Sequence, residues 1–164
     1  MAAVTQFEDP NYLEAVYDAL FQKLKSAKFA GGLKLQTWQR AVEAPSNIQP
    51  ELQPALVLIN GPIHVEQKEF GLAKWTLTAV AAVYIWAEGA SVLDQMQLPA
   101  TMANRIVWGF AQALQPPGTP QMYEKQDLGG IVYHAWIEGA VLTEVQAQQI
   151  VVTVPIMMLA GPNG

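Results

Sequence analysis

Two histidines and the glutamates near them are the residues of this chain whose types could support acid-base or metal chemistry. His64 and His134 each fall in a predicted strand, with Glu66 and Glu138 close by in the sequence. Metal sites commonly space histidines as HxH, HxxxH or HExxH, and neither histidine has such a partner. A His-Glu pair without a placed nucleophile or substrate pocket does not make a mechanism. These residues are therefore predicted to be structural.

The other common catalytic and ligand-binding patterns are missing from the sequence. The chain has no cysteine, which excludes a disulfide framework, a thiolate nucleophile and a sulfur-ligated metal. No serine lies in a GxSxG elbow, and the glycine pairs at 31–32 and 129–130 fit neither GxGxxG nor GxxxxGK. We therefore expect a protein that is not an enzyme and has no cofactor or metal.

Composition predicts one domain over residues 1–164, with part of its surface buried against partners. The chain is 51% hydrophobic and only 14% charged, which is rich in apolar residues for a monomer of this size. Its net charge of -5 argues against a nucleic-acid clamp, which needs a basic face. Residues 1–40 hold five Lys/Arg against four Asp/Glu, whereas residues 41–164 hold four against ten. The acidity is therefore expected in the sheet-rich part.

No segment of the sequence has the features of a secretory signal or a membrane span. The N-terminus lacks a basic region followed by an apolar run. The apolar stretch at 75–87 is too short to cross a bilayer as a helix, and its β-branched and aromatic residues alternate with a period of two. We expect a strand there and no membrane segment.

The first predicted element is a helix near the N-terminus. Apolar residues recur at helical spacing and form one stripe, namely Leu13, Val16, Tyr17, Leu20 and Leu24. Asn11 is predicted to cap its start, three residues before Glu14, and Gly31-Gly32 to end it. Its last turns hold three lysines, which are predicted to be solvent-exposed and matched to the helix dipole rather than a phosphate site: Lys23, Lys25 and Lys28.

Strands and a long hairpin are predicted for the next part of the chain. A first strand is expected at about 33–42, and a second begins with the apolar run 55–59. Pro62 makes a bend or bulge more consistent with the Asn-Gly-Pro sequence than a tight turn. Residues 66–74 then form the tip of a hairpin that leads into a strand at 75–86. One face of that strand is expected to meet the helices, and the other to be lightly covered or to pack against a neighbouring subunit.

The C-terminal half is predicted to add one helix and an antiparallel pair of strands. The helix, at about 100–114, repeats apolar residues every four positions, namely Met102, Ile106, Phe110 and Leu114. Trp108 lies off this stripe, so it either covers another part of the core or is exposed. Residues 128–159 are predicted to form two apolar strands joined by a connection of about ten residues. The expected fold is α+β, an antiparallel or mixed sheet flanked by two main helices, with a long β-hairpin.

The hairpin tip and the end of the long strand are the predicted sites of protein-protein contact. Phe70 is an aromatic residue among the charged residues of the tip, beside Lys68 and Glu69. It could fold back onto its own hairpin or anchor the protein to a partner. Trp86, at the end of strand 75–86, is the fourth predicted interface residue.

The order of these elements resembles that of tail terminator proteins of long-tailed bacteriophages, also called tail completion or minor tail proteins. The likeness covers nearly the whole chain. Its most specific segments are the front helix followed by PALVLI, the strand KWTLTAVAAVYIWA, and LGGIVYHAWIEG before the last strand.

The resemblance implies a structural virion protein that caps the head-proximal end of the tail tube. It implies a hexameric ring of this chain, which stops tube growth and then presents its other face to a head-completion or stopper protein. The genome would pass through the channel without sequence-specific binding, and assembly would take place in the host cytoplasm. An acidic channel wall suits this role, because it repels DNA rather than gripping it.

Two other classes of function remain open at this point. The nearer one is another neck component, such as a head-closure or head-tail connector protein. The more distant one is a small α+β enzyme or ligand-binding domain, whose pocket would be lined by aromatic residues of the strands, namely Trp75, Tyr84, Trp86 and Trp136.

Overall fold

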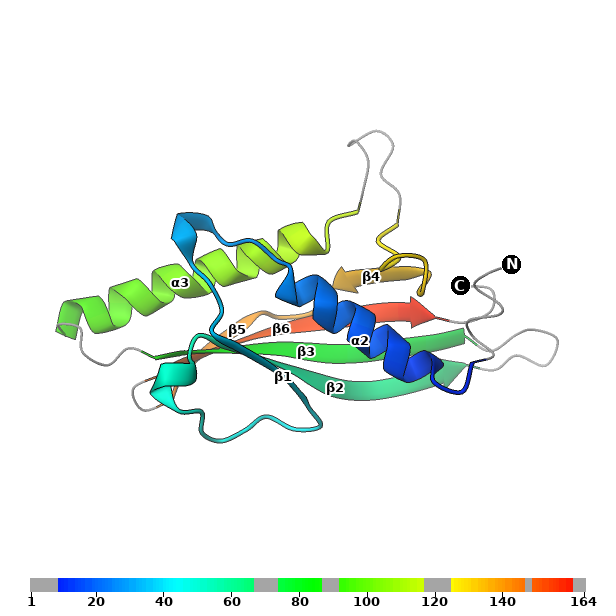
Figure 1. Cartoon of the computed structure of the whole chain (residues 1–164), viewed down its shortest axis with the longest axis horizontal. Helices are drawn as coiled ribbons and strands as arrows, with labels where there is room; N and C mark the ends of the chain where they lie inside the picture. Colours follow the sequence, from blue (N-terminus) through cyan, green and yellow to red (C-terminus); the bar gives the residue numbers. More distant parts are fainter. Residues whose placement is uncertain (1–8, 67–73, 87–91, 117–124, 147–148, 161–164) are drawn as a thin grey trace.

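A computed structural model describes residues 9–66, 74–86, 92–116, 125–146 and 149–160, with side chains left out at 92–99. It confirms the predicted α+β class: two helices lie against a six-stranded mixed sheet (Figure 1). The helices are α2 (Tyr12–Lys25) and α3 (Val92–Ala113), and the short 3-10 helices are η1 (Ala30–Gly32) and η2 (Pro50–Leu52). The strands are β1 (Thr37–Ala41), β2 (Ala55–Glu66), β3 (Lys74–Trp86), β4 (His134–Ile137), β5 (Leu142–Gln146) and β6 (Gln149–Ala160).

The sheet has the strand order β1-β2-β3-β6-β4, and β5 also pairs with β6. Only β1 and β2 run parallel; the other pairs are antiparallel. The centre is formed by β3 and β6, which pair along their whole lengths from Trp75 opposite Ala160 to Trp86 opposite Gln149. These two strands therefore fix the position of everything that lies on either face.

The two helices cover the same face of the sheet, and the core lies between them and the strands. The residues of α2 that the core buries are those of the predicted stripe together with Tyr12, except that Leu13 is only partly buried. On α3, Ile106 and Phe110 are buried as the spacing predicted, and so is Leu114 directly after the helix, whereas Met102 is only partly buried. The predicted inner face of β3 is confirmed, since Leu77 through Ile85 at every second position are fully or almost fully buried.

Both ends of α2 differ from the sequence-based expectation. Asn11 does not cap the helix with its side chain; Asp9 accepts the Asn11 backbone N-H at 2.9 Å instead. The helix ends at Lys25, well before the glycines, because the chain turns after Ser26 and passes through η1 with positive φ at Gly31. The glycines thus shape the connection to β1 rather than the helix end, and Lys28 lies in that connection.

The C-terminal half also departs from the prediction at two places. Helix α3 begins at Val92, earlier than the expected start near residue 100, and runs through Pro99. The prediction of a ten-residue connection between the last two strands is wrong, because this segment contains the strand β5. Strand β5 pairs with the first half of β6, and β4 pairs with the second half. The chain bends between them at Gly139, whose φ is +112°. The antiparallel pairing itself is confirmed.

The Asn-Gly-Pro sequence forms the predicted irregularity within one strand, not a hairpin turn. The register between β2 and β3 shifts between Asn60 and Ile63. At this bulge Thr78 of β3 donates its hydroxyl to the Pro62 carbonyl at 2.6 Å. Any Cβ at Gly61 would collide with the Thr78 side chain, so the close approach of the two strands requires glycine here.

Candidate functional site

The predicted interface residues divide into those that the structure describes and those that it does not. Lys68, Glu69 and Phe70 lie outside the described residues. Strands β2 and β3 do converge on that segment, with Glu66 opposite Lys74, so the predicted antiparallel pair is confirmed up to its tip. Trp86 is half-buried at the other end of β3, opposite Gln149.

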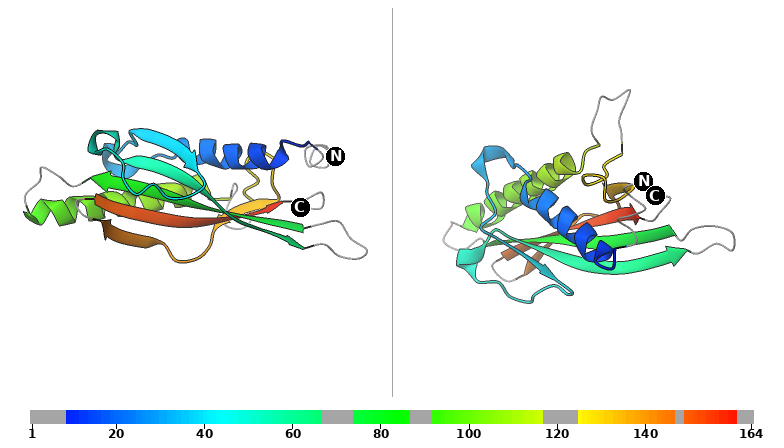
Figure 2. Two further views of the ribbon diagram at one scale, coloured as in Figure 1. Left: turned by 90° about the horizontal axis from the view of Figure 1, so that it is seen from below. Right: turned by 45° about the vertical axis from the view of Figure 1, so that its right-hand side comes forward.

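The face of the sheet that points away from the helices has two different halves, one that is covered and one that is lined by half-buried apolar side chains. One half is covered by the connection 42–54 between β1 and β2, which is drawn at the lower left of Figure 1. The other half has no layer over it among the described residues. Figure 2 shows the sheet edge-on, with α2 on one side of the strands and β5 near the other. We call the sheet face that points away from the helices the outer face.

Hydrogen bonds hold the connection 42–54 against its half of the outer face. The Tyr84 hydroxyl donates to the Pro45 carbonyl at 2.8 Å. The buried Gln53 amide donates to the Ile48 carbonyl at 3.0 Å and to the Gln149 side-chain oxygen at 2.9 Å. A small second core lies beneath, formed by Ile48, Ala55, Val57, Ala82, Tyr84 and Val151. This half is thus a closed layer of the protein.

The uncovered half of the outer face is lined mainly by apolar side chains. In β6 every second residue from Thr153 onward is half-buried, whereas the residues between are buried against the helices. The strand register places these side chains in one continuous surface with neighbours on β2, β3 and β4. We call this surface the open patch, and its members are Ile59, Val80, Trp136, Pro155, Met157 and Leu159.

An exposed strand edge borders the covered half of the outer face, because β5 pairs with Gln149–Thr153 of β6. All residues of β5 are exposed, including Leu142 at 51% and Val145 at 59%, and β5 pairs only with β6 among the described strands. A strand edge of this kind presents unpaired backbone groups that another chain can use. Glu144 gives this edge a negative charge at its centre.

The two histidines lie on the outer face but are too far apart to act together. They occupy the ends of one cross-strand row, in which His64 faces Thr76, Thr76 faces Leu159, and Leu159 faces His134. Three inter-strand steps of about 4.8 Å separate them by about 14 Å. Among the described residues, no group of three His, Cys, Asp or Glu side chains could hold a metal ion.

His134 and Glu138 are engaged in contacts within the protomer. The Nδ1 atom of His134 accepts the backbone N-H of Gln126 at 3.1 Å, and its ring stacks on Trp136 at 5.0 Å between centroids. Glu138 accepts the Trp136 indole N-H at 2.9 Å rather than pairing with a histidine. These contacts support the structural role predicted for His134 and Glu138, and they orient Trp136 in the open patch.

The structure does not bring together the aromatic residues proposed to line a ligand pocket. Trp75 and Trp86 stand near opposite ends of β3, roughly 37 Å apart at about 3.4 Å per residue. Tyr84 is buried under the connection 42–54, and Trp136 lies on the far side of β6, opposite Met157. These four residues therefore do not line one pocket, as the enzyme or ligand-binding alternative requires.

Three tyrosines have shifted pKa values that report packing. Burial raises the pKa of Tyr12, Tyr17 and Tyr84, and the Arg40 charge partly offsets this for Tyr17. Each donates to a backbone carbonyl: Tyr12 to Ile131, Tyr17 to Thr78 and Tyr84 to Pro45. The three hydroxyls therefore link segments that are distant in the sequence.

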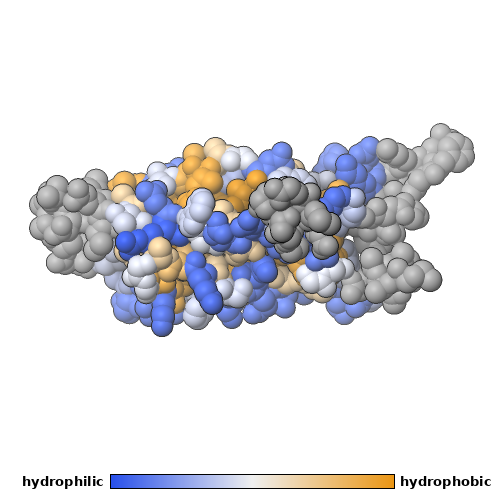
Figure 3. Space-filling view, turned by 90° about the horizontal axis from the view of Figure 1, so that it is seen from above, coloured by the Kyte–Doolittle hydropathy of each residue, from blue (hydrophilic) through white to orange (hydrophobic). Residues whose placement is uncertain are grey.

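Hydrophobic residues are present on the surface of the protein as well as in its core. Seen from above, hydrophobic residues reach the surface in several groups among hydrophilic ones (Figure 3). Trp108, on α3, is 66% exposed, which decides the alternative left open by its place off the helical stripe. Among the described residues, no helix is long and apolar enough to cross a membrane.

Comparison with known proteins assigns no family to the chain. No protein-family model matches it, and a search of the curated proteins finds no match.

Among the surface residues described above, sequence reasoning missed the β6 members of the open patch and the β5 edge. The sequence of β6 does not indicate which of its faces is exposed, because both faces are hydrophobic. On one face lie Pro155, Met157 and Leu159, and their neighbours on the other face are equally apolar.

Proposed function

We propose that this protein is a tail terminator of a long-tailed bacteriophage, which caps the head-proximal end of the tail tube as a hexameric ring. In this role it ends tube polymerisation, and its other face receives a head-completion or stopper protein. The genome passes through the channel without sequence-specific binding. The protein acts in the virion, in the tail or neck, after assembly in the host cytoplasm.

The observation that carries this proposal is the open patch. A protomer that functions alone rarely leaves half of a sheet face lined by Ile59, Val80, Met157 and Leu159 without a covering layer. The half-buried side chains and the tryptophan beside them match the apolar, aromatic composition of interface cores. A subunit contact would give this surface a covering layer that the described residues lack.

The position of the apolar surfaces suits a ring. A ring forms when one surface of a subunit binds a different surface of the next and the rotation closes. The open patch lies on the outer face, whereas the exposed Trp108 lies on the helix layer on the opposite side of the sheet. An apolar patch on one side and an exposed tryptophan on the other therefore allow head-to-tail contact.

The charge distribution is consistent with a channel for DNA. The acidic balance of residues 41–164 gives the sheet-rich part a negative field, which repels phosphates and keeps a passing polyanion from binding. The remaining class, another neck component such as a head-closure or connector protein, shares this requirement. The two are distinguished by whether loss of the protein changes tail length.

The test is to place a charge at the centre of the open patch in the virus that encodes the protein. Met157→Glu should leave the protomer folded, because the side chain reaches the surface, but should prevent subunit contact by burying a carboxylate. Electron microscopy should then show tails of uncontrolled length that fail to join heads. Met157→Leu is the matched control and should give normal particles.

The results separate the alternatives. Tails of normal length that lack heads would favour a head-closure or connector protein. The terminator role would be refuted if the virus made normal virions with the Met157→Glu variant, or if it made them without the protein. Light scattering on the purified chain adds a second test, since a stable monomer that binds a metabolite would favour the ligand-binding alternative.

A further inference from the structure

Positive charge is concentrated in one short segment of an otherwise acidic protein. Residues 19–42 contain five basic residues and no Asp or Glu, a balance of +5. The rest of the chain holds four Lys/Arg and 14 Asp/Glu, a balance of -10. The basic residues of the segment are Lys23, Lys25, Lys28, Lys34 and Arg40. Such segregation creates a local field that attracts an acidic partner.

This basic segment surrounds a cavity of about 450 Å³ beside β1. Three lysines stand around it, Lys25, Lys28 and Lys34, and all are exposed. Its apolar walls include Phe29, Leu35 and Trp38, and no acidic residue lines it. Trp38 is 42% exposed, and the Lys25 ammonium lies 5.2 Å from its ring centroid. The cavity thus offers an apolar interior with positive charges at its rim.

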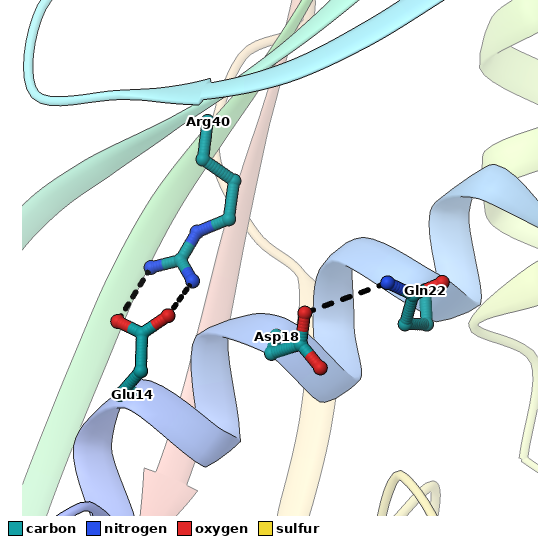
Figure 4. A network of polar contacts seen from close by, with 4 residues as sticks. All are labelled: Glu14, Asp18, Gln22 and Arg40. Atoms are coloured by element: carbon teal, nitrogen blue, oxygen red, sulfur yellow. Dashed lines mark hydrogen bonds and ion pairs between the residues drawn. The ribbon is translucent and has the colours of Figure 1, made fainter.

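The walls of the cavity are held by packing on both sides. The ring of Phe29 meets that of Phe110 edge-on at 5.7 Å, and the chain at 28–29 lies so close to α3 that only glycine fits at position 109. On the other side, Arg40 of β1 forms a two-pronged contact with Glu14 of α2 (Figure 4), which ties the strand that carries Trp38 to the helix that carries Lys25.

The cavity adjoins a free strand edge. Strand β1 ends the order β1-β2-β3-β6-β4, and it pairs only with β2. Among the described residues, no backbone hydrogen bond joins its other edge to another segment. An extended peptide that pairs with this edge would place every second side chain on the same face of the sheet as Trp38.

We propose that this site binds an extended acidic peptide of another protein. The peptide adds a strand to the free edge of β1, inserts an aromatic or large aliphatic side chain into the cavity beside Trp38, and places its carboxylates against Lys25, Lys28 and Lys34. The free strand edge favours a peptide over a small anion, because its backbone groups suit a second chain. The inference goes beyond the proposed function and stands independently of it.

The test uses the purified full chain and end-blocked fluorescent peptides of the form Asp-Glu-Xaa-Glu-Xaa-Glu-Asp, with Phe, Trp or Leu at both Xaa positions. Fluorescence anisotropy should give saturable binding that weakens with salt. The double change Lys28→Glu and Lys34→Glu should weaken it about tenfold or more, which corresponds to about 1.4 kcal/mol. Trp38→Ala should weaken binding and shift the preference among the three side chains.

Two controls separate strand addition from simple charge attraction. Lys74→Glu makes the charge change of one of these two substitutions at an exposed residue far from the cavity and should leave the affinity unchanged. N-methylation of one alternate set of peptide nitrogens should abolish binding, and methylation of the other set should not, because only one set faces β1. Circular dichroism and thermal melting verify that each variant is folded.

The outcomes against the proposal are equally specific. It is overturned if no acidic peptide of the panel binds, if the lysine double variant binds as well as the wild type, or if both N-methylated forms bind equally. It is also overturned if ATP or inorganic phosphate displaces the peptide at equal concentration, because the site would then be one for small anions.

Discussion

The two faces of β6 differ in what covers them, although their sequence is equally apolar. Val154, Ile156 and Met158 are buried against the helices, whereas Pro155, Met157 and Leu159 are half-buried on the outer face. The first set is covered within the protomer, and the second has no layer over it among the described residues. The comparison teaches that hydrophobicity alone does not separate core from interface; the position of the covering layer does.

The adjacent methionines of β6 provide the sharpest test of this comparison. Met158→Ala removes a fully buried side chain and should lower the free energy of unfolding by about 2–5 kcal/mol. Met157→Ala, on the other face, should cost roughly 1 kcal/mol or less, because that side chain reaches solvent in the protomer. Urea denaturation followed by circular dichroism measures both. Equal losses would show that both faces are core.

The covered half of the outer face depends on its buried amide contact. Gln53→Ala removes the bonds to Ile48 and Gln149 and leaves the buried Gln149 side chain without this partner. The expected loss of stability is about 1–3 kcal/mol. Proteolysis of the connection 42–54 should accelerate in parallel. If stability falls but the cleavage rate does not, the amides do not hold the connection in place.

The hydroxyl of Tyr84 tests the same layer by pH. Burial raises its pKa above 10.0, so the folded state favours the neutral phenol. Its contribution is therefore fully present below pH 10 and lost as pH rises through the folded-state pKa. Tyr84→Phe should lower stability at pH 7 by about 0.5–1.5 kcal/mol and flatten part of the alkaline loss. Thermal melts from pH 7 to pH 11 check this, and an unchanged alkaline slope would contradict it.

The smallest effect is expected where the helix layer meets the edge of the sheet. Glu14→Gln removes the ion pair with Arg40, in which Glu14 is 68% exposed. An exposed pair contributes about 0.2–1 kcal/mol, so the melting temperature should change little. High salt should reduce the difference between wild type and variant. A loss comparable to that of Met158→Ala would mean that α2 relies on this contact far more than its exposure indicates.

Local sequence pattern predicted much of the fold, and it failed where contacts between segments distant in the sequence determine the structure. The inner face of β3 and the stripe of α2 follow from residues that alternate or recur, because one face of each is apolar. Asn11 occupies the N-cap position of α2 as predicted, but the capping hydrogen bonds differ, since Glu14 binds Arg40 on β1 and Asp9 accepts the Asn11 N-H. The β5 strand was taken for a connection because its residues are exposed and its pairing depends on β6.

The candidate sites were predicted less completely than the fold. The sequence identified an aromatic hairpin tip at Phe70, which lies outside the described residues, and Trp86. It indicated the β3 part of the open patch, because one face of strand 75–86 was expected to be lightly covered or to pack against a neighbouring subunit, but not the members on β2, β4 and β6. It also gave no sign that Lys25 and Trp38, from a helix and a strand, share one cavity.

The sequence by itself determined where the two helices and most of the strands lie along the chain, the excess of apolar over charged residues, and the concentration of lysine between residues 23 and 34. These follow from local periodicity and composition. Only the tertiary structure decided which face of β6 is covered, that the histidines lie at opposite ends of one row, and that β1 is left with a free edge. The reason is physical: burial and strand pairing are properties of segments brought together from distant positions, and no local pattern records which segments those are.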